Sequence, residues 1–142
     1  MYNGSNKTLI KNLLIVTALF ESVTGIGLIA MPALLVRLLL GVTLDTSGAL
    51  VLAHVAGAAL LTLGIACWLA RNDTKVRAII SAMLVYNFAV AGVLMHANLG
   101  LGVYGIGLWP AAGAHFVMAF WCIACLRAVR DKLLNDANTQ TN

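Results

Sequence analysis

The chain has 142 residues, of which 61% are hydrophobic and only 10% are charged. An average soluble domain has roughly 45–50% apolar and about 25% charged residues. Nine basic and five acidic side chains are too few to cover the surface of a soluble domain, so the composition excludes a soluble globular protein. The same apolar content excludes disorder, and the length indicates a single domain.

Four apolar segments are long enough to cross a membrane. A transmembrane helix needs about 20 apolar residues, because the hydrocarbon core is about 30 Å thick and a helix rises about 1.5 Å per residue. The apolar runs are continuous and do not alternate, so they predict helices and not the strands of a barrel. The predicted spans cover residues 9–31, 49–70, 76–98 and 108–126. Together they predict an all-α four-helix up-down bundle.

The first span contains Glu21, the only acidic residue inside a predicted span. A charged group at the centre of a transmembrane helix costs about 2.5–3.5 kcal/mol on insertion scales. Glu21 is therefore expected to face the bundle and to be neutral or paired, and Thr24 shares its face at helical spacing. Two interpretations stay open. Glu21 is a proton site, a ligand anchor or an ion ligand, or it is a protonated carboxyl group that stabilises a helix contact.

The segment 32–41 follows the first span and is short and apolar, with Arg37 as its single charge. Its pattern predicts a short interfacial helix on the outer face of the membrane.

Small residues recur on one face of each later span, and such faces favour close helix packing in lipid. In the second span these are Ala53, Gly57, Leu60, Gly64 and Cys67; in the third, Ala82, Ala89, Gly92 and His96; in the fourth, Ala111, His115, Ala119 and Cys122.

The three histidines His54, His96 and His115 are all predicted to lie in the outer half of the bilayer or at its edge. If two of them faced each other, they could ligate haem or another metal centre. No spacing requires this, and no cofactor is expected. A haem site, or a quinone or lipid-headgroup pocket lined by Glu21, His54 and His115, remains an alternative.

Asn87 and His96 lie nine residues apart in the third span. That separation is about two and a half helical turns, so the two side chains point in opposite directions. One of them must meet a groove, the headgroups or another protein chain, which favours a homo-oligomer or a subunit of a larger membrane complex.

The connection after Asn98 contains four glycines, and Gly100, Gly102 and Gly105 match the pattern G-x-G-x-x-G. No strand precedes the pattern, so it does not predict a dinucleotide site. It predicts an irregular outer loop or a loosened helix start.

The three cysteines, Cys67, Cys122 and Cys125, are predicted to lie near the inner side of the membrane, where disulfides are disfavoured. We interpret them as small hydrophobic residues.

The basic residues lie almost entirely on one side of this topology. Eight of the nine flank the inner ends of the spans, and Arg37 alone is outside. The positive-inside rule then places both termini in the cytoplasm. The distribution also explains the net charge of +4 without a nucleic-acid partner. The domain covers residues 1–134, and residues 135–142 are predicted to be a polar flexible tail.

Several short motifs resemble a family of small bacterial four-helix inner-membrane proteins that is distantly DoxX-like. The likeness implies a multi-pass protein of the bacterial inner membrane. Through the DoxX-type proteins it also implies a link to quinone oxidoreduction or thiol stress. The motifs are Glu21-x-x-Thr24-Gly25, Pro32-x-Leu34, Leu39-Leu40-Gly41, His54-Val55-Ala56-Gly57, Leu63 to Trp68, Met83-Leu84-x-Tyr86-Asn87, and Leu108-Trp109-Pro110-Ala111 followed by His115.

The sequence favours a non-enzymatic membrane subunit or scaffold that binds a partner protein, a lipid or a quinone. No serine-hydrolase, nucleotide-binding or zinc-protease pattern is present, so an enzyme is not expected. The alternatives are a haem- or quinone-dependent redox component and an oligomeric proton-coupled transporter that uses a buried Glu. The candidate ligand or proton residues are Glu21, His54, His115, His96, Asn87 and Thr24.

Overall fold

The computed structural model describes residues 4–73 and 76–140, which form five helices. Four of them, counting the first 24 residues of the last helix, are long and apolar enough to cross a membrane. The predicted four-helix bundle with a short additional helix is confirmed. The helices are α1 (Gly4–Ala30), α2 (Pro32–Leu40), α3 (Ser47–Ala70), α4 (Arg77–Leu101) and α5 (Leu108–Gln140).

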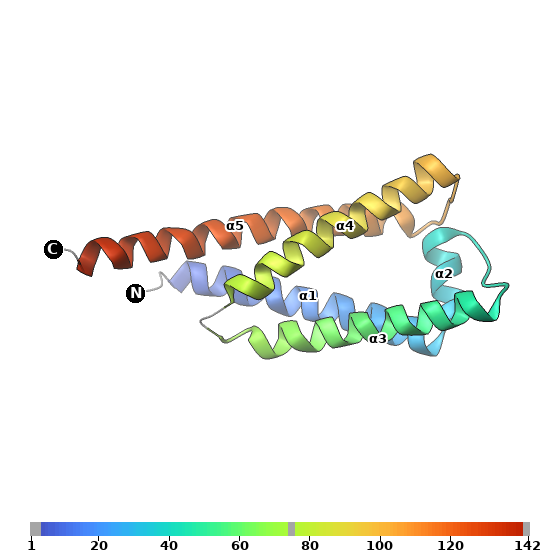
Figure 1. Ribbon diagram of the computed structural model, residues 1–142, viewed down its shortest axis with the longest axis horizontal. Coiled ribbons are helices and arrows are strands. Elements are labelled where there is room, and N and C mark those ends of the chain that lie inside the picture. The colour runs from blue at the N-terminus through green and yellow to red at the C-terminus, as the bar shows by residue number, and fades with distance from the viewer. Residues whose placement is uncertain (1–3, 74–75, 141–142) are drawn as a thin grey trace.

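The long helices run up and down the same axis (Figure 1). Both termini and the α3–α4 connection lie at one end of the bundle, which we call the terminal end. Helix α2 and the α4–α5 connection lie at the opposite end, the α2 end. α5 continues through residues 135–140 of the segment predicted as a tail, while residues 141–142 lie outside the described residues. The flexibility of that segment stays a prediction.

The ends of the helices have local causes in the sequence. Pro32 occupies the first turn of α2, where its missing N–H is not needed. Gly41 ends α2 in the left-handed conformation (φ 72°) and donates its N–H to the Arg37 carbonyl. The side chain of Thr46 accepts a 3.1 Å hydrogen bond from the Ala49 N–H and begins α3. Gly102 ends α4 in the same way as Gly41 (φ 65°).

Helices α1 and α3 pack closely because small residues meet at their interface. A Cβ atom at Gly25 would lie 2.6 Å from the Leu61 nitrogen and 2.7 Å from the Gly57 oxygen. A Cβ atom at Gly64 would overlap the Ser22 hydroxyl. The α3 stripe predicted to pack is therefore at a helix contact, where backbone meets backbone.

Helices α4 and α5 form a second close pair, and here one prediction is wrong. The α4 residues predicted to pack, Ala82, Ala89, Gly92 and His96, are all exposed. The buried face is roughly opposite and includes Asn87 and Ala91. Burying the Asn87 amide requires hydrogen-bond partners, and the rotation of α4 that brings Asn87 inward turns His96 outward. The predicted α5 stripe does face the interior, since His115, Ala119 and Cys122 are buried.

The three cysteines are free and buried. They belong to the apolar core near the terminal end, with Leu14 and Met83. This agrees with the interpretation of the cysteines as small hydrophobic residues.

The α4–α5 connection docks onto the end of α2. The Gly107 N–H donates a 2.9 Å hydrogen bond to the Leu38 carbonyl, and a Cβ atom at Gly105 would overlap the Leu39 carbonyl. From the last turn of α4, the Asn98 side-chain amide donates to the Val103 carbonyl in the loop at 2.9 Å. The irregular loop predicted here therefore begins at Gly102, and its glycines let it approach the α2 backbone. The contact holds α2 across the end of the bundle.

Candidate functional site

Glu21 is the centre of the candidate site. Its side chain is 1% exposed, and Oε2 accepts a 2.9 Å hydrogen bond from the Tyr86 hydroxyl. Because α1 packs mainly on α3 and α4 mainly on α5, this hydrogen bond crosses between the two helix pairs. The buried acid in the first span is thus paired with a neutral donor.

The second carboxyl oxygen of Glu21 has no such partner. Among the described residues, Oε1 of Glu21 is one of two buried side-chain polar atoms without a hydrogen bond. Buried polar groups are hydrogen-bonded in the great majority of cases, because leaving one unpaired costs about 1–3 kcal/mol. Glu21 therefore keeps one hydrogen-bonding position open in the interior of the bundle.

A second polar pair lies beside Glu21 and fixes the state of His115. The Asn87 Nδ2 group donates to the Met83 carbonyl at 2.7 Å, so the Asn87 oxygen faces His115 Nδ1 at 2.8 Å. An amide oxygen only accepts, so Nδ1 must carry the hydrogen. In the neutral ring, Nε2 of His115 is then a hydrogen-bond acceptor.

Aromatic rings hold the His115 imidazole from two sides. The Phe20 ring lies 5.6 Å from it at 87°, and the Tyr86 ring lies 5.7 Å from it at 78°. Both are edge-to-face arrangements, which are favourable for aromatic pairs. The imidazole is thus positioned by α1 and α4 as well as by its own helix.

These side chains border a cavity of about 260 Å³. Its polar lining consists of Glu21, Thr24, Tyr86 and His115, and the Thr24 hydroxyl is turned to the Phe20 carbonyl at 2.8 Å. The remaining walls are apolar and come from all five helices and the end of the loop before α5. They are Phe20, Leu28, Leu35, Leu38, Leu39, Leu60, Val90, Leu94, Gly107 and Ala111.

The structure brings four of the six candidate residues together. Glu21, Thr24 and His115 line the cavity, and Asn87 does not line it but is hydrogen-bonded to His115. The other two, His54 and His96, are exposed and do not line it. The cavity lined by Glu21 and His115 therefore does not include His54. The functional roles of all six residues stay predictions.

Sequence reasoning missed Tyr86 and Phe20 as site residues. One feature of the sequence does point to Tyr86, namely its distance from the start of its span, which is close to that of Glu21. Glu21 lies ten residues beyond Lys11, and Tyr86 lies nine residues beyond Arg77. Since both helices rise from the same end, the two side chains reach the same level of the bundle.

The site can exchange hydrogen bonds with a ligand but is not arranged as a metal centre. Among the described residues, no group of three or more His, Cys, Asp or Glu could hold a metal ion. Glu21 Oε1 accepts a hydrogen bond when ionised and donates one when protonated, and His115 Nε2 accepts. A ligand hydroxyl, which accepts and donates, therefore matches a protonated Glu21 and His115 Nε2 together.

Fold and site together define a multi-pass membrane protein with a partly open, mainly apolar cavity that carries a small polar cluster. Its outward apolar side chains, such as Leu52, Val85 and Val93, contact the lipid bilayer. Comparison with protein families, curated proteins and solved structures found no match to this chain.

Proposed function

We propose that this protein is a non-enzymatic membrane protein that binds a hydrophobic ligand with a hydroxyl-bearing ring, of the quinol class, in the Glu21 cavity. The observation that carries the proposal is that Glu21 lines that cavity while its Oε1 is buried without a hydrogen-bond partner. A carboxyl group kept only to join two helices would be expected to have both oxygens paired within the protein. A ligand hydroxyl supplies the missing partner.

The polar groups around the cavity match a ring hydroxyl. His115 Nε2 accepts a hydrogen bond, because Asn87 fixes the hydrogen on Nδ1. The same hydroxyl can accept a hydrogen bond from the Glu21 carboxyl group when that group is protonated. Phe20 and Tyr86 present aromatic rings next to these two groups, which favours a flat ligand ring.

The size and apolar walls of the cavity also support this ligand class. A cavity of about 150 Å³ is sufficient for a benzene ring, and the Glu21 cavity has about 260 Å³. Leucines 35, 38 and 39 of α2 line it and offer an apolar surface to a ligand side chain. A hydrophobic ligand would enter from the surrounding lipid.

The proposal includes an orientation and a location. Described basic residues concentrate at the terminal end, among them Lys7, Lys11, Arg71 and Arg127, while Arg37 lies near the α2 end. This asymmetry supports cytoplasmic termini, and the motif resemblance supports the bacterial inner membrane. A membrane-impermeant thiol reagent added outside should label Thr43→Cys and not Ser5→Cys, and the reverse result would overturn the orientation.

Association with another chain is also part of the proposal. His96 is exposed on an apolar helix, as is the small-residue stripe of α4, and a second protein chain would cover both. Native mass spectrometry from mild detergent should then release an oligomer or a larger complex. A monomer at every protein concentration would overturn this part.

Ligand binding can be tested with a decyl-substituted benzoquinol and the detergent-purified protein. Isothermal titration calorimetry should detect binding, and decylbenzene, which lacks hydroxyls, should bind at least tenfold more weakly. The loss of one ligand hydrogen bond is worth about 1.4 kcal/mol, or tenfold. His115→Leu should therefore weaken binding about tenfold, and its matched control His54→Leu should not.

A second variant keeps the test clear if His115→Leu fails to fold. Ala111 lines the cavity and is half-buried, so Ala111→Leu should fill part of the cavity and abolish quinol binding. Ala58→Leu, on the exposed face of α3, is its control. Equal binding by wild type and Ala111→Leu, or equal affinity for the quinol and decylbenzene, would overturn the proposed function.

A further inference from the structure

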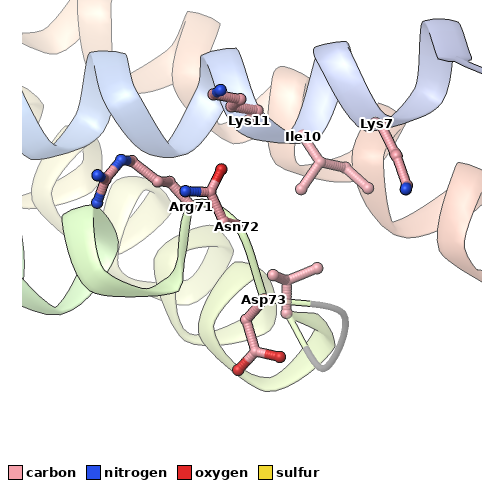
Figure 2. A pocket seen from close by; sticks show the side chains of 7 residues that line it. Lys7, Ile10, Lys11, Arg71, Asn72 and Asp73 are labelled. Atoms are coloured by element: carbon pink, nitrogen blue, oxygen red, sulfur yellow. The ribbon is translucent and has the colours of Figure 1, made fainter.

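A second cavity lies at the terminal end, far from α2. It has a volume of about 280 Å³ and is bordered by α1 and by the connection from α3 to α4. Figure 2 shows its side chains, which come from these two segments. They are Lys7, Ile10, Lys11, Arg71, Asn72, Asp73 and Val76.

Three basic side chains border this cavity, and in Figure 2 the charged ends of Lys7 and Arg71 lie on opposite sides of it. Lys7 and Lys11 project from successive turns of α1, and Arg71 approaches from the end of α3 (Figure 2). The fold thus places basic residues from two different helices around one cavity. Such a cluster attracts an anion, and its pull is strongest where water is partly excluded.

Arg71 is held in position before any ligand arrives. Its guanidinium lies 4.0 Å from the centre of the Trp68 ring, and it donates a hydrogen bond to the Trp68 carbonyl. An arginine has five N–H donors, so the others remain available. A positioned guanidinium loses less conformational freedom on binding than a mobile one.

Asp73 is the one acidic residue at the cavity. Its carboxylate points away from α1 in Figure 2, whereas the Asn72 amide and the Arg71 guanidinium lie on the side of α1. The part of the cavity between α1 and Arg71 is therefore basic. The amide of Asn72 adds a neutral hydrogen-bond donor there.

The cavity has an apolar floor and lies at the edge of the spans. Ile10 and Val76 are 5% and 2% exposed and both line it. Trp68, which supports Arg71, is 44% exposed, and exposed tryptophans near the ends of spans are typical of the interface between lipid and water. Lipid headgroups and their phosphates occupy the same level.

We infer that this cavity is a binding site for the phosphate of an anionic phospholipid headgroup. Lys11 and Arg71 bind the phosphate oxygens, Lys7 adds positive charge at the border of the cavity, and Ile10 and Val76 contact the apolar part of the lipid next to the headgroup. Basic pockets between transmembrane helices are suited to such headgroups. A free phosphate ion would use the same cations, but it would gain nothing from the apolar floor. The site is separate from the Glu21 cavity and does not depend on the function proposed for it.

Native mass spectrometry of the detergent-purified full chain tests the inference. The complex with phosphatidylglycerol should appear at a lower concentration of added lipid than the complex with phosphatidylcholine. Each removed positive charge should weaken phosphatidylglycerol binding about fivefold, since a basic residue near an anionic membrane surface is worth about 1 kcal/mol. Lys11→Gln and Arg71→Gln should both show this loss, and circular dichroism checks that each variant is folded.

Arg127→Gln is the matched control. It removes the same charge from an exposed arginine in a different groove, between α4 and α5, and should change binding less than twofold. A loss equal to that of Arg71→Gln would mean a diffuse attraction to the basic end of the bundle and would overturn the site. Displacement of the lipid by millimolar inorganic phosphate would assign the cavity to a soluble anion and would overturn the lipid.

Discussion

The Tyr86 hydroxyl donates a 2.9 Å hydrogen bond to Oε2 of Glu21 and thereby joins α4 to α1. These helices belong to different close-packed pairs, α1 with α3 and α4 with α5. The hydrogen bond therefore ties the two pairs together at the level of the cavity. One oxygen of Glu21 serves this contact, and the other stays open, so a structural role and a binding role are compatible in one carboxyl group.

Removing the Tyr86 hydroxyl tests whether its hydrogen bond to Glu21 stabilises the bundle. Tyr86→Phe should lower the free energy of unfolding by about 0.5–2 kcal/mol, the range of hydrogen bonds between transmembrane helices. Phenylalanine keeps the edge-to-face contact with His115. The measurement is reversible unfolding by SDS in mixed micelles, followed by circular dichroism. Tyr104→Phe, in the exposed α4–α5 connection, is the control, and a loss of similar size there would contradict a specific role for Tyr86.

Gly25 should not tolerate even one added carbon. A Cβ atom there would meet backbone atoms of α3 at 2.6 and 2.7 Å, so Gly25→Ala must push α1 and α3 apart. We expect a loss of about 1–3 kcal/mol in the same unfolding measurement, as for other overpacked sites. Gly113→Ala meets no atom within 4 Å and should stabilise α5 by up to about 1 kcal/mol. Equal effects would show that the α1–α3 contact is looser than described.

The tautomer of His115 can be observed directly. Because the Asn87 oxygen faces Nδ1, ¹⁵N chemical shifts of labelled protein should report the Nδ1–H form. Exposed His54 should show the mixture usual for a solvated or interfacial ring. Asn87→Leu should shift His115 toward the Nε2–H form and destabilise the protein by about 1–3 kcal/mol, since Nδ1 loses its buried partner. An Nε2–H signal in the wild type would contradict the assignment.

Gly41 controls the position of α2 and, through it, the cavity. Its φ of 72° is unfavourable for other L-residues by roughly 1–2 kcal/mol, and a Cβ atom would overlap the Tyr104 carbonyl. Gly41→Ala should lower both stability and quinol affinity, because leucines of α2 line the cavity. Gly48→Ala meets nothing within 4 Å and should change neither. Unaltered affinity in Gly41→Ala would separate α2 from ligand binding.

The buried cysteines should resist modification in the folded protein. N-phenylmaleimide dissolves in lipid, so slow labelling would report burial inside the bundle and not merely inside the membrane. Ala66→Cys offers a matched control, because residue 66 is exposed next to buried Cys67. We expect rapid labelling of the introduced thiol alone, and of all thiols after unfolding in SDS. Rapid labelling of the wild type would contradict the core position of the cysteines.

The end of α4 shows how accurately the local sequence predicts where a helix stops. The third span was expected to end at Asn98, ahead of the glycines, yet α4 continues to Leu101. Several glycines stand in this region, and only Gly102 adopts the left-handed conformation that ends the helix. Which glycine does so depends on the docking of Gly105 and Gly107 against α2, a contact that lies outside the local sequence.

The sequence predicts the interior position of Glu21, because a charge in lipid is costly. It does not predict that Tyr86 is the hydrogen-bond partner of Glu21. A tyrosine in a span carries no comparable penalty, so nothing in the local pattern marks Tyr86 as a donor. The pairing requires α1 and α4 to face each other at one depth. Likewise, either Asn87 or His96 had to turn outward. The hydrogen bonds of Asn87 with Met83 and His115 hold Asn87 inside, and His96 is therefore the residue that turns outward.

The sequence by itself determined that the chain crosses a membrane four times, because transfer of apolar segments into lipid depends on length and composition alone. It also determined that Glu21 lies inside. The tertiary structure decided which face of each helix turns inward and that the polar side chains meet at a cavity. In helices that are apolar all round, hydropathy does not distinguish one face from another. The rotation of each helix is set by steric fit at glycines such as Gly25 and by the hydrogen bonds of the few buried polar groups.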